Sequence, residues 1–268
     1  MKLLNPKGDV NLHTHTYYCD GKDAPEDMVR AALDLGFKTL GFSGHGYSVH
    51  DEDYCMSKGN TLKYRQEVRR LQEAYKDRID ILLGVEMDYY GEKEDYPYDF
   101  VIGSVHSIEK DGVMLSVDNT EAVMAQNVER FFGGDYRAYV ERYYEIEADV
   151  LRRTEADIIG HFDLVTKFNE GNKHFDEEAD WYQEAALKAL RTVAAGREGA
   201  GKKPVFEINT GAMARGYRSR PYPADFLLAE IEKLDCPVIL SSDCHDRKQL
   251  DYGFKEVLKR LRQGKHEL

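Results

Sequence analysis

The sequence predicts an α/β fold arranged around a parallel β-sheet. Short apolar runs alternate with helical stretches along the chain, which is the order expected of successive βα units. The chain has 268 residues, a length that α/β barrels reach as one domain. We find no linker, low-complexity tract or internal repeat, so residues 1–268 are expected to form a single domain.

The first predicted strand covers residues 9–15 and ends in the motif HTH. The helix after it is expected to begin at Asp23, an N-terminal cap residue, and to end at Gly36. Met28 and Leu35 then lie on one apolar face of this helix. A strand followed by such a helix is the first βα unit of the predicted sheet.

The other predicted strands are apolar runs bounded by turn residues, and the helices between them show helical periodicity. The seven predicted strands cover residues 9–15, 38–45, 79–89, 99–107, 157–163, 204–210 and 237–243. The later helices are predicted over residues 63–75, 136–154, 181–194, 224–234 and 248–262. Residues 110–135 lack a clear period and are expected to form an irregular excursion.

Composition and charge narrow the classes of partner. A formal net charge of -12 disfavours nucleic acid, whose binding depends on Lys and Arg contacts, and favours a small substrate. No run approaches the ~18 apolar residues that a membrane helix needs, and the N-terminal segment does not resemble a secretory signal. The four cysteines form no CxxC pair, which indicates free thiols. We therefore expect a cytoplasmic protein without membrane contact, whose oligomeric state the sequence leaves open.

A strongly polar residue stands at the carboxyl end of every predicted strand. Because the carboxyl ends of parallel strands open onto one face of a barrel, these side chains are expected to converge. His13 and His15 lie two residues apart on a strand, so both point to the same side. The residues at the strand ends are His13, His15, His45, Glu86, His106, His161, Asn209, Asp243 and His245.

Each of these residues has an ordinary structural interpretation. An HxH pair can lie on a solvated strand face, Glu86 alone can be a cap or an ion-pair partner, and His161 can be a hydrogen-bonded core histidine. Core packing explains the whole set poorly, because burying many ionisable groups without compensation costs several kcal/mol for each. The set therefore predicts a metal centre. Seven or eight such ligands can serve about two or three ions, with Glu86 as the natural bridge.

The motifs that carry these residues resemble those of the polymerase and histidinol phosphatase (PHP) family of metal-dependent phosphoesterases, in family order and over nearly the whole chain. They are HTH at residues 13–15, GFSGHG around His45, GVEMDY at Glu86, GSVHS at His106, GHFD at His161 and SSDCHD at Asp243 and His245. The chain is most similar to the stand-alone histidinol-phosphate phosphatases. The resemblance implies a distorted (β/α)7 barrel with a metal site at the C-terminal ends of the strands.

The resemblance also implies which residues bind zinc, manganese or iron. The implied ligands are His13, His15, Glu86 and Asp243 for the first ion, Glu86, His106 and His161 for the second, and His45 and His245 for the third. Asp20 lies near the place where relatives carry a further histidine for the third ion. Many relatives have an aspartate where this chain has Gly44. Glu86, Asp243 and His245 are the expected catalytic residues.

A segment rich in arginine follows the sixth predicted strand and suits a phosphate pocket. Asn209 ends that strand, and Arg215, Arg218 and Arg220 supply planar donors that match phosphate oxygens. The alternative is that these arginines are solvated or paired with some of the 49 acidic residues. Lys167 is a weaker candidate for the same role.

The function implied by the resemblance is hydrolysis of L-histidinol phosphate to L-histidinol and phosphate, a step of histidine biosynthesis, by attack of a metal-bridging hydroxide. Three alternatives stay open: a PHP phosphoesterase for a nucleotide, phosphoprotein or other small phosphomonoester, a metal-dependent amidohydrolase, and a non-catalytic metal-binding module. An amidohydrolase typically has a ligating lysine at a strand end, and none is evident. His50, His174 and His266 are expected on the surface, and Cys19 and Cys244 are expected beside the site without binding metal.

Overall fold

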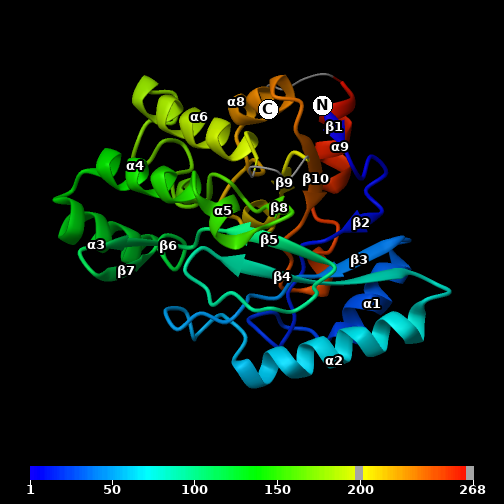
Figure 1. Ribbon diagram of the computed structural model, residues 1–268. Coiled ribbons are helices and arrows are strands. Elements are labelled where there is room, and N and C mark those ends of the chain that lie inside the picture. The colour runs from blue at the N-terminus through cyan, green and yellow to red at the C-terminus, as the bar shows by residue number, and fades with distance from the viewer. Residues whose placement is uncertain (197–201, 264–268) are drawn as a thin grey trace.

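The computed structural model describes residues 1–196 and 202–263, and these residues form a parallel sheet of eight strands surrounded by helices (Figure 1). The strand order is β1-β10-β9-β8-β5-β4-β3-β2, and every neighbouring pair is parallel. The strands of the sheet are β1 (Lys2–Leu3), β2 (Val10–Asn11), β3 (Thr39–Phe42), β4 (Asp80–Asp88), β5 (Phe100–Ser104), β8 (Ile158–Ile159), β9 (Val205–Asn209) and β10 (Pro237–Ser241).

The sheet closes where the edge strand β2 approaches β10, the neighbour of the other edge strand β1. Thr14 and Cys244 form an isolated parallel bridge, and the backbone N–H of His15 donates to the carbonyl of Cys244 at 3.0 Å. The Asn5 side-chain amide donates to the carbonyls of Val10, at 2.8 Å, and Leu240, at 2.7 Å. These contacts close the sheet, which confirms the predicted distorted barrel. Of the eight strands, only the two-residue β1 was not predicted.

The helices cover the outside of the barrel. In Figure 1, α1 and α2 lie below the sheet beside β3 and β4, whereas α4, α6 and α8 lie above it. The helices are α1 (Pro25–Asp34), α2 (Lys58–Tyr75), α3 (Glu121–Phe132), α4 (Tyr136–Glu147), α5 (Val150–Thr154), α6 (Asp180–Ala194), α7 (Gly211–Ala214), α8 (Asp225–Lys233) and α9 (Phe254–Arg262). No helix of the described residues is long and apolar enough to cross a membrane.

Apolar side chains fill the barrel interior beneath its carboxyl-end face. Phe100, Ile102, Ile158 and Ile239 form this plug, with Leu12, Leu82 and Val205 against it. The Phe100 ring lies so close to Gly84 that a Cβ there would sit 2.4 Å from Cζ, which explains the glycine. Because side chains alternate with a period of two along a strand, Leu82 shares a face of β4 with Glu86, and Ile239 shares a face of β10 with Ser241. Inward-facing polar residues therefore lie directly above the apolar plug.

The excursion predicted as irregular is ordered. The strand β6 (Ser107–Lys110) leads into it and forms a hairpin with β7 (Val113–Ser116). The helix α3 follows, and the Thr120 side chain caps it by accepting from Val123 N–H at 3.2 Å. The first helix differs from expectation at both ends. Ala24 rather than Asp23 precedes it, and Leu35 lies beyond its end with 48% of its surface exposed.

Candidate metal centre

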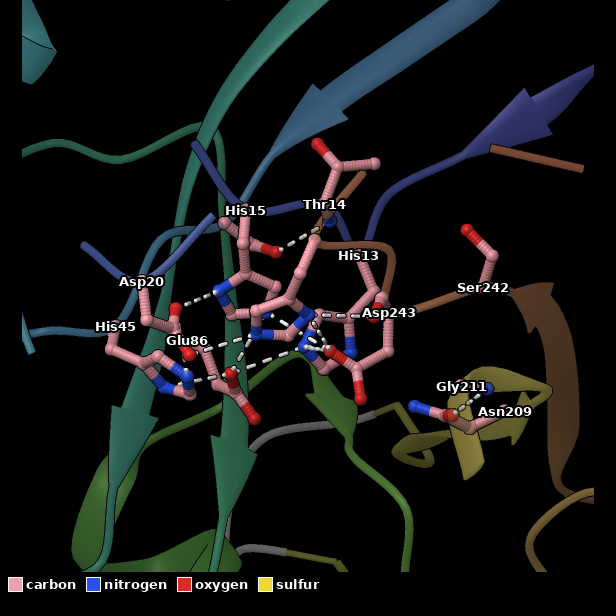
Figure 2. Close-up of polar contacts among 12 residues, drawn as sticks. His13, Thr14, His15, Asp20, His45, Glu86, Asn209, Gly211, Ser242 and Asp243 are labelled. Carbon is pink, nitrogen blue, oxygen red and sulfur yellow. Dashed lines mark hydrogen bonds and ion pairs between the residues drawn. The ribbon is translucent and has the colours of Figure 1, made fainter. Parts of the chain in front are cut away.

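The candidate ligands stand at or just beyond the carboxyl ends of the barrel strands (Figure 2). Glu86 lies on β4, whereas His45 and His106 follow β3 and β5. The loops after β2, β8 and β10 carry the remaining predicted ligands. Hydrogen bonding of each parallel strand to its neighbours holds these ends at one level, as the sequence pattern predicts.

All nine predicted ligands fall into four overlapping groups, within each of which the ligand atoms lie no more than 4.8 Å apart. Four of the residues each belong to two groups, which links the groups into one centre; they are His13, His15, His45 and Glu86. The groups are His15, Asp20, His45 and His245; His13, Glu86 and His161; His13, His15 and Asp243; and His45, Glu86 and His106.

The Glu86 carboxylate lies in the middle of this centre and is 1% exposed. Its Oε2 atom lies 3.1 Å from His13 Nε2 and 3.0 Å from His45 Nδ1. Its Oε1 atom lies 3.0 Å from His161 Nε2 and 3.4 Å from His106 Nε2. One carboxylate therefore faces histidines from four different strands, a geometry that suits a bridge between two cations.

The donor atoms fit bound cations because several of them are buried without hydrogen bonds. Within the described residues, Nε2 of His13, Nε2 of His15, Oδ1 of Asp20 and Oε2 of Glu86 have no hydrogen-bond partner. Leaving a buried polar atom unpaired costs about 1–3 kcal/mol. Metal ions would satisfy these converging lone pairs, and imidazole and carboxylate are the donors that zinc, manganese and iron accept.

The protonation states also suit ligand roles at two residues. Burial and the neighbouring His245 and His45 lower the pKa of His15 to about 3, so this imidazole keeps its lone pair at neutral pH. Burial alone would raise the pKa of Glu86, but the positive charge of protonated His13, His45 and His106 holds it well below its usual range, and cations bound by these histidines would act in the same direction. Glu86 therefore stays anionic.

Asp20 is the centre of the group that the resemblance assigns to a third ion. Its Oδ2 atom lies 2.9 Å from His245 Nε2, and its Oδ1 atom lies 3.6 Å from His15 Nδ1 and 3.7 Å from His45 Nε2.

The Cys19 side chain occupies the space beside Gly44, because a Cβ at position 44 would lie 3.2 Å from Cys19 Sγ. Burial raises the pKa of Cys19 to about 12, so the thiol stays protonated beside the centre.

A family model described as "PHP domain" matches residues 11–196. The chain belongs to this family. A protein of Deinococcus radiodurans described as a "Probable histidinol-phosphatase" is 30% identical over 95% of this chain and 93% of its own length. The histidinol-phosphatase of Bacillus subtilis is 25% identical over 92% of this chain and 97% of its own length.

A solved structure has the same fold. It is the histidinol phosphate phosphatase of Lactococcus lactis, complexed with zinc, L-histidinol and phosphate. The two chains align with a TM-score of 0.71 and 22% identity, over 100% of this chain and 95% of that one. This alignment independently supports the distorted barrel. It also covers β9 and β10, which lie beyond the residues matched by the family model.

The structure separates the three predicted phosphate-binding arginines. Arg215 adjoins the candidate metal centre: its guanidinium donates to Asp243 Oδ2 at 3.0 Å and lies 3.0 Å from His245 Nδ1. Arg218 instead makes a two-pronged contact with Glu177, at 2.8 and 2.9 Å. Arg220 is half exposed and lies 3.4 Å from Asp225.

The other two predicted phosphate-binding residues also have protein partners. Asn209 lies to one side of the histidines in Figure 2, where its Oδ1 atom accepts from Gly211 N–H at 2.8 Å. Lys167 donates to the carbonyl of Asp118 at 2.6 Å. His50 lies on the surface, but His174 is mostly covered, with a bond of 2.7 Å to Glu121, and His266 lies outside the described residues.

Sequence reasoning missed two carboxylates beside the centre. Asp88 Oδ2 accepts from the His106 backbone N–H at 3.0 Å, and Glu207 Oε1 lies 2.6 Å from His13 Nδ1. Both residues share the inward strand face with a recognised polar residue, since Asp88 is two positions after Glu86 and Glu207 two before Asn209. That period of two is the sequence signal that could have identified them.

Proposed function

We propose that this PHP domain is a metal-dependent phosphomonoesterase that hydrolyses L-histidinol phosphate to L-histidinol and phosphate. The convergence of histidines from four strands on the buried Glu86 carboxylate is the observation that carries the proposal. Relatives that match nearly the whole chain are named histidinol-phosphatases, which supports this substrate.

Three groups of residues would hold two to three divalent transition-metal ions, zinc, manganese or iron. The proposed ligands are His13, His15, Glu86 and Asp243 for the first, Glu86, His106 and His161 for the second, and His45, His245 and Asp20 for the third. Ions bound there would supply Lewis acidity toward the phosphoryl oxygens and lower the pKa of a nearby water molecule.

The protein residues themselves set the charge and the orientation of the reacting groups. Glu86 and Asp243 place negative charge where cations would otherwise repel each other. Arg215 contacts Asp243 but keeps 30% of its side chain exposed, so its remaining N–H groups can reach a phosphoryl oxygen. We therefore assign the phosphate contact to Arg215 ahead of Arg218 and Arg220, which face Glu177 and Asp225.

The proposed catalytic unit is the single domain of residues 1–268. Asp243 and His245 follow β10, which lies beyond residue 196, where the family match ends. Because β9 and β10 stand between β1 and β8 in the sheet, these strands are part of the barrel rather than an appendage. Residues on both sides of position 196 are needed to complete the centre.

Phosphate release from a panel of phosphomonoesters tests the proposal. The purified chain, loaded with zinc or manganese, should hydrolyse L-histidinol phosphate with a higher kcat/KM than nucleotides, sugar phosphates or a phosphopeptide. Faster hydrolysis of another class would assign a different substrate to the same centre. No release from any ester, by a chain that binds its metal ions, would contradict the enzymatic proposal.

A further inference from the structure

Glu207 is a buried acid beside the metal centre that lies in none of the four groups of candidate ligands. It stands in the middle of β9 with its side chain on the inward face, between Val205 and Asn209. The side chain is 1% exposed. An ionised acid at such a depth needs partners for its lone pairs.

Both carboxylate oxygens of Glu207 are engaged by protein donors. Oε1 accepts from Nδ1 of His13, at 2.6 Å, and from the Ser241 hydroxyl. Oε2 accepts from the backbone N–H of His161, at 2.9 Å, and from the side-chain amide of Asn209, at 2.8 Å. The donors come from the ends of β2, β8, β9 and β10, so one carboxylate ties together four strand ends.

The contact with His13 determines which nitrogen of that imidazole carries the proton. A neutral imidazole has one N–H and one lone pair. With the N–H at Nδ1 pointing to Glu207, the lone pair is on Nε2. That atom has no hydrogen bond among the described residues and lies 3.1 Å from Glu86 Oε2 and 3.5 Å from Asp243 Oδ1.

The contact with His161 acts on the backbone. β8 contains only Ile158 and Ile159, but backbone bonding to β5 continues to Gly160, whose N–H donates to the carbonyl of Gly103 at 3.0 Å. The bond from His161 N–H to Glu207 fixes the next residue, the candidate ligand itself. His161 Nε2 then lies 3.0 Å from Glu86 Oε1, on the other side of the bridging carboxylate from His13.

We propose that Glu207 is a positioning residue that fixes His13 in the Nδ1–H tautomer and holds His161, so that both present a ligand atom beside Glu86. This inference rests on the metal centre of the proposed function. A carboxylate behind a ligating histidine sets its tautomer and increases its basicity, and losing such a partner typically weakens metal affinity by about 10–100-fold.

The variant E207Q keeps the shape of the side chain but turns one acceptor into a donor. Its amide must face either His13 Nδ1–H or His161 N–H with an N–H group of its own, so one of the two contacts is lost. E230Q is the matched control, because Glu230 is also buried, at 7% exposure, but accepts from Arg191 on the outer helix layer.

The test is a zinc titration of the full chain, stripped of metal, against a chromophoric chelator. We expect E207Q to bind zinc about 10–100-fold more weakly than the parent, and E230Q to match the parent. Equal affinity of E207Q and the parent would overturn the inference. Because no phosphoester is present, a chain that shows this difference but does not hydrolyse L-histidinol phosphate would contradict only the proposed function.

A second measurement needs no variant and decides the matter even where E207Q fails to fold. Nitrogen-15 NMR of histidine side chains in the zinc-loaded parent distinguishes a protonated ring nitrogen from a zinc-bound one. His13 should carry its proton on Nδ1 and zinc on Nε2. Zinc on Nδ1, or no zinc on His13, would overturn the role of Glu207.

Discussion

Oε2 of Glu86 lies 3.1 Å from Nε2 of His13, and neither atom has a hydrogen bond within the described residues. Two buried acceptors at this distance repel each other unless a proton or a cation lies between them. In the proposed metal centre, a cation shared by both atoms would remove this repulsion.

The first prediction concerns metal content. Elemental analysis of protein purified without chelator should find about two to three transition-metal ions per chain, because the nine candidate ligands form overlapping groups. Less than one ion per chain, with no activation by added zinc, manganese or iron, would exclude the centre.

The second prediction concerns the proposed bridge. Glu86→Gln preserves the shape of the side chain but removes the negative charge between the cations, so turnover should fall by orders of magnitude. Circular dichroism should show a folded protein, since the apolar plug lies below this residue. A folded variant with near-normal kcat would rule out bridging by Glu86.

The third prediction concerns which arginine binds the substrate phosphate. Arg215→Ala should lower kcat/KM. The fall should correspond to a loss of roughly 2–4 kcal/mol of transition-state stabilisation, which is typical of removing one preorganised donor. Arg215→Lys should recover part of it, because an ammonium lacks the planar fork. Arg220→Ala is the control and should change kcat/KM by less than about twofold, ~0.4 kcal/mol. Similar losses in both alanine variants would mean that the phosphate is bound elsewhere.

The fourth prediction concerns the pH dependence of stability. Glu147 ends α4 with both carboxylate oxygens buried and without hydrogen bonds among the described residues. Burial raises its pKa well above the usual value, so the folded protein keeps the proton that the unfolded chain releases above pH ~4.5. This residue therefore lowers stability as pH rises, by up to about 1.4 kcal/mol per pH unit until its folded pKa is reached.

Glu147→Gln removes this ionisation while keeping the size of the side chain. The variant should gain stability over the parent between pH 5 and pH 8, and the difference should shrink toward pH 4. Urea unfolding of both proteins across this range measures the effect. A constant difference in unfolding free energy across the range would show that Glu147 ionises alike in both states.

The predicted metal ligands could be identified because their signal is local. His13, His45 and Glu86 each stand at the end of a recognisable apolar strand, and a parallel barrel brings such ends together. The role of Glu207 depends on His13, a residue 194 positions away, and no short pattern encodes that contact. A period-two reading of β9 would nevertheless have placed the acid on the inward face.

The arginines show the corresponding limit for the substrate pocket. Arg215 and Arg218 are three residues apart in one segment, yet one contacts Asp243 and the other Glu177. Their different partners come from distant parts of the chain, so composition alone could not rank them. The missed helix α3 is a different case, because its Thr120 cap and left-handed Gly133 are local signals present in the sequence.

Metal-dependent phosphate release from L-histidinol phosphate tests the central claim most directly. The chain should be inactive after removal of its metal ions, and activity should return with added zinc or manganese to a plateau at about two to three ions per chain. Release at an undiminished rate by the metal-free chain, or none at any metal load, would contradict the account.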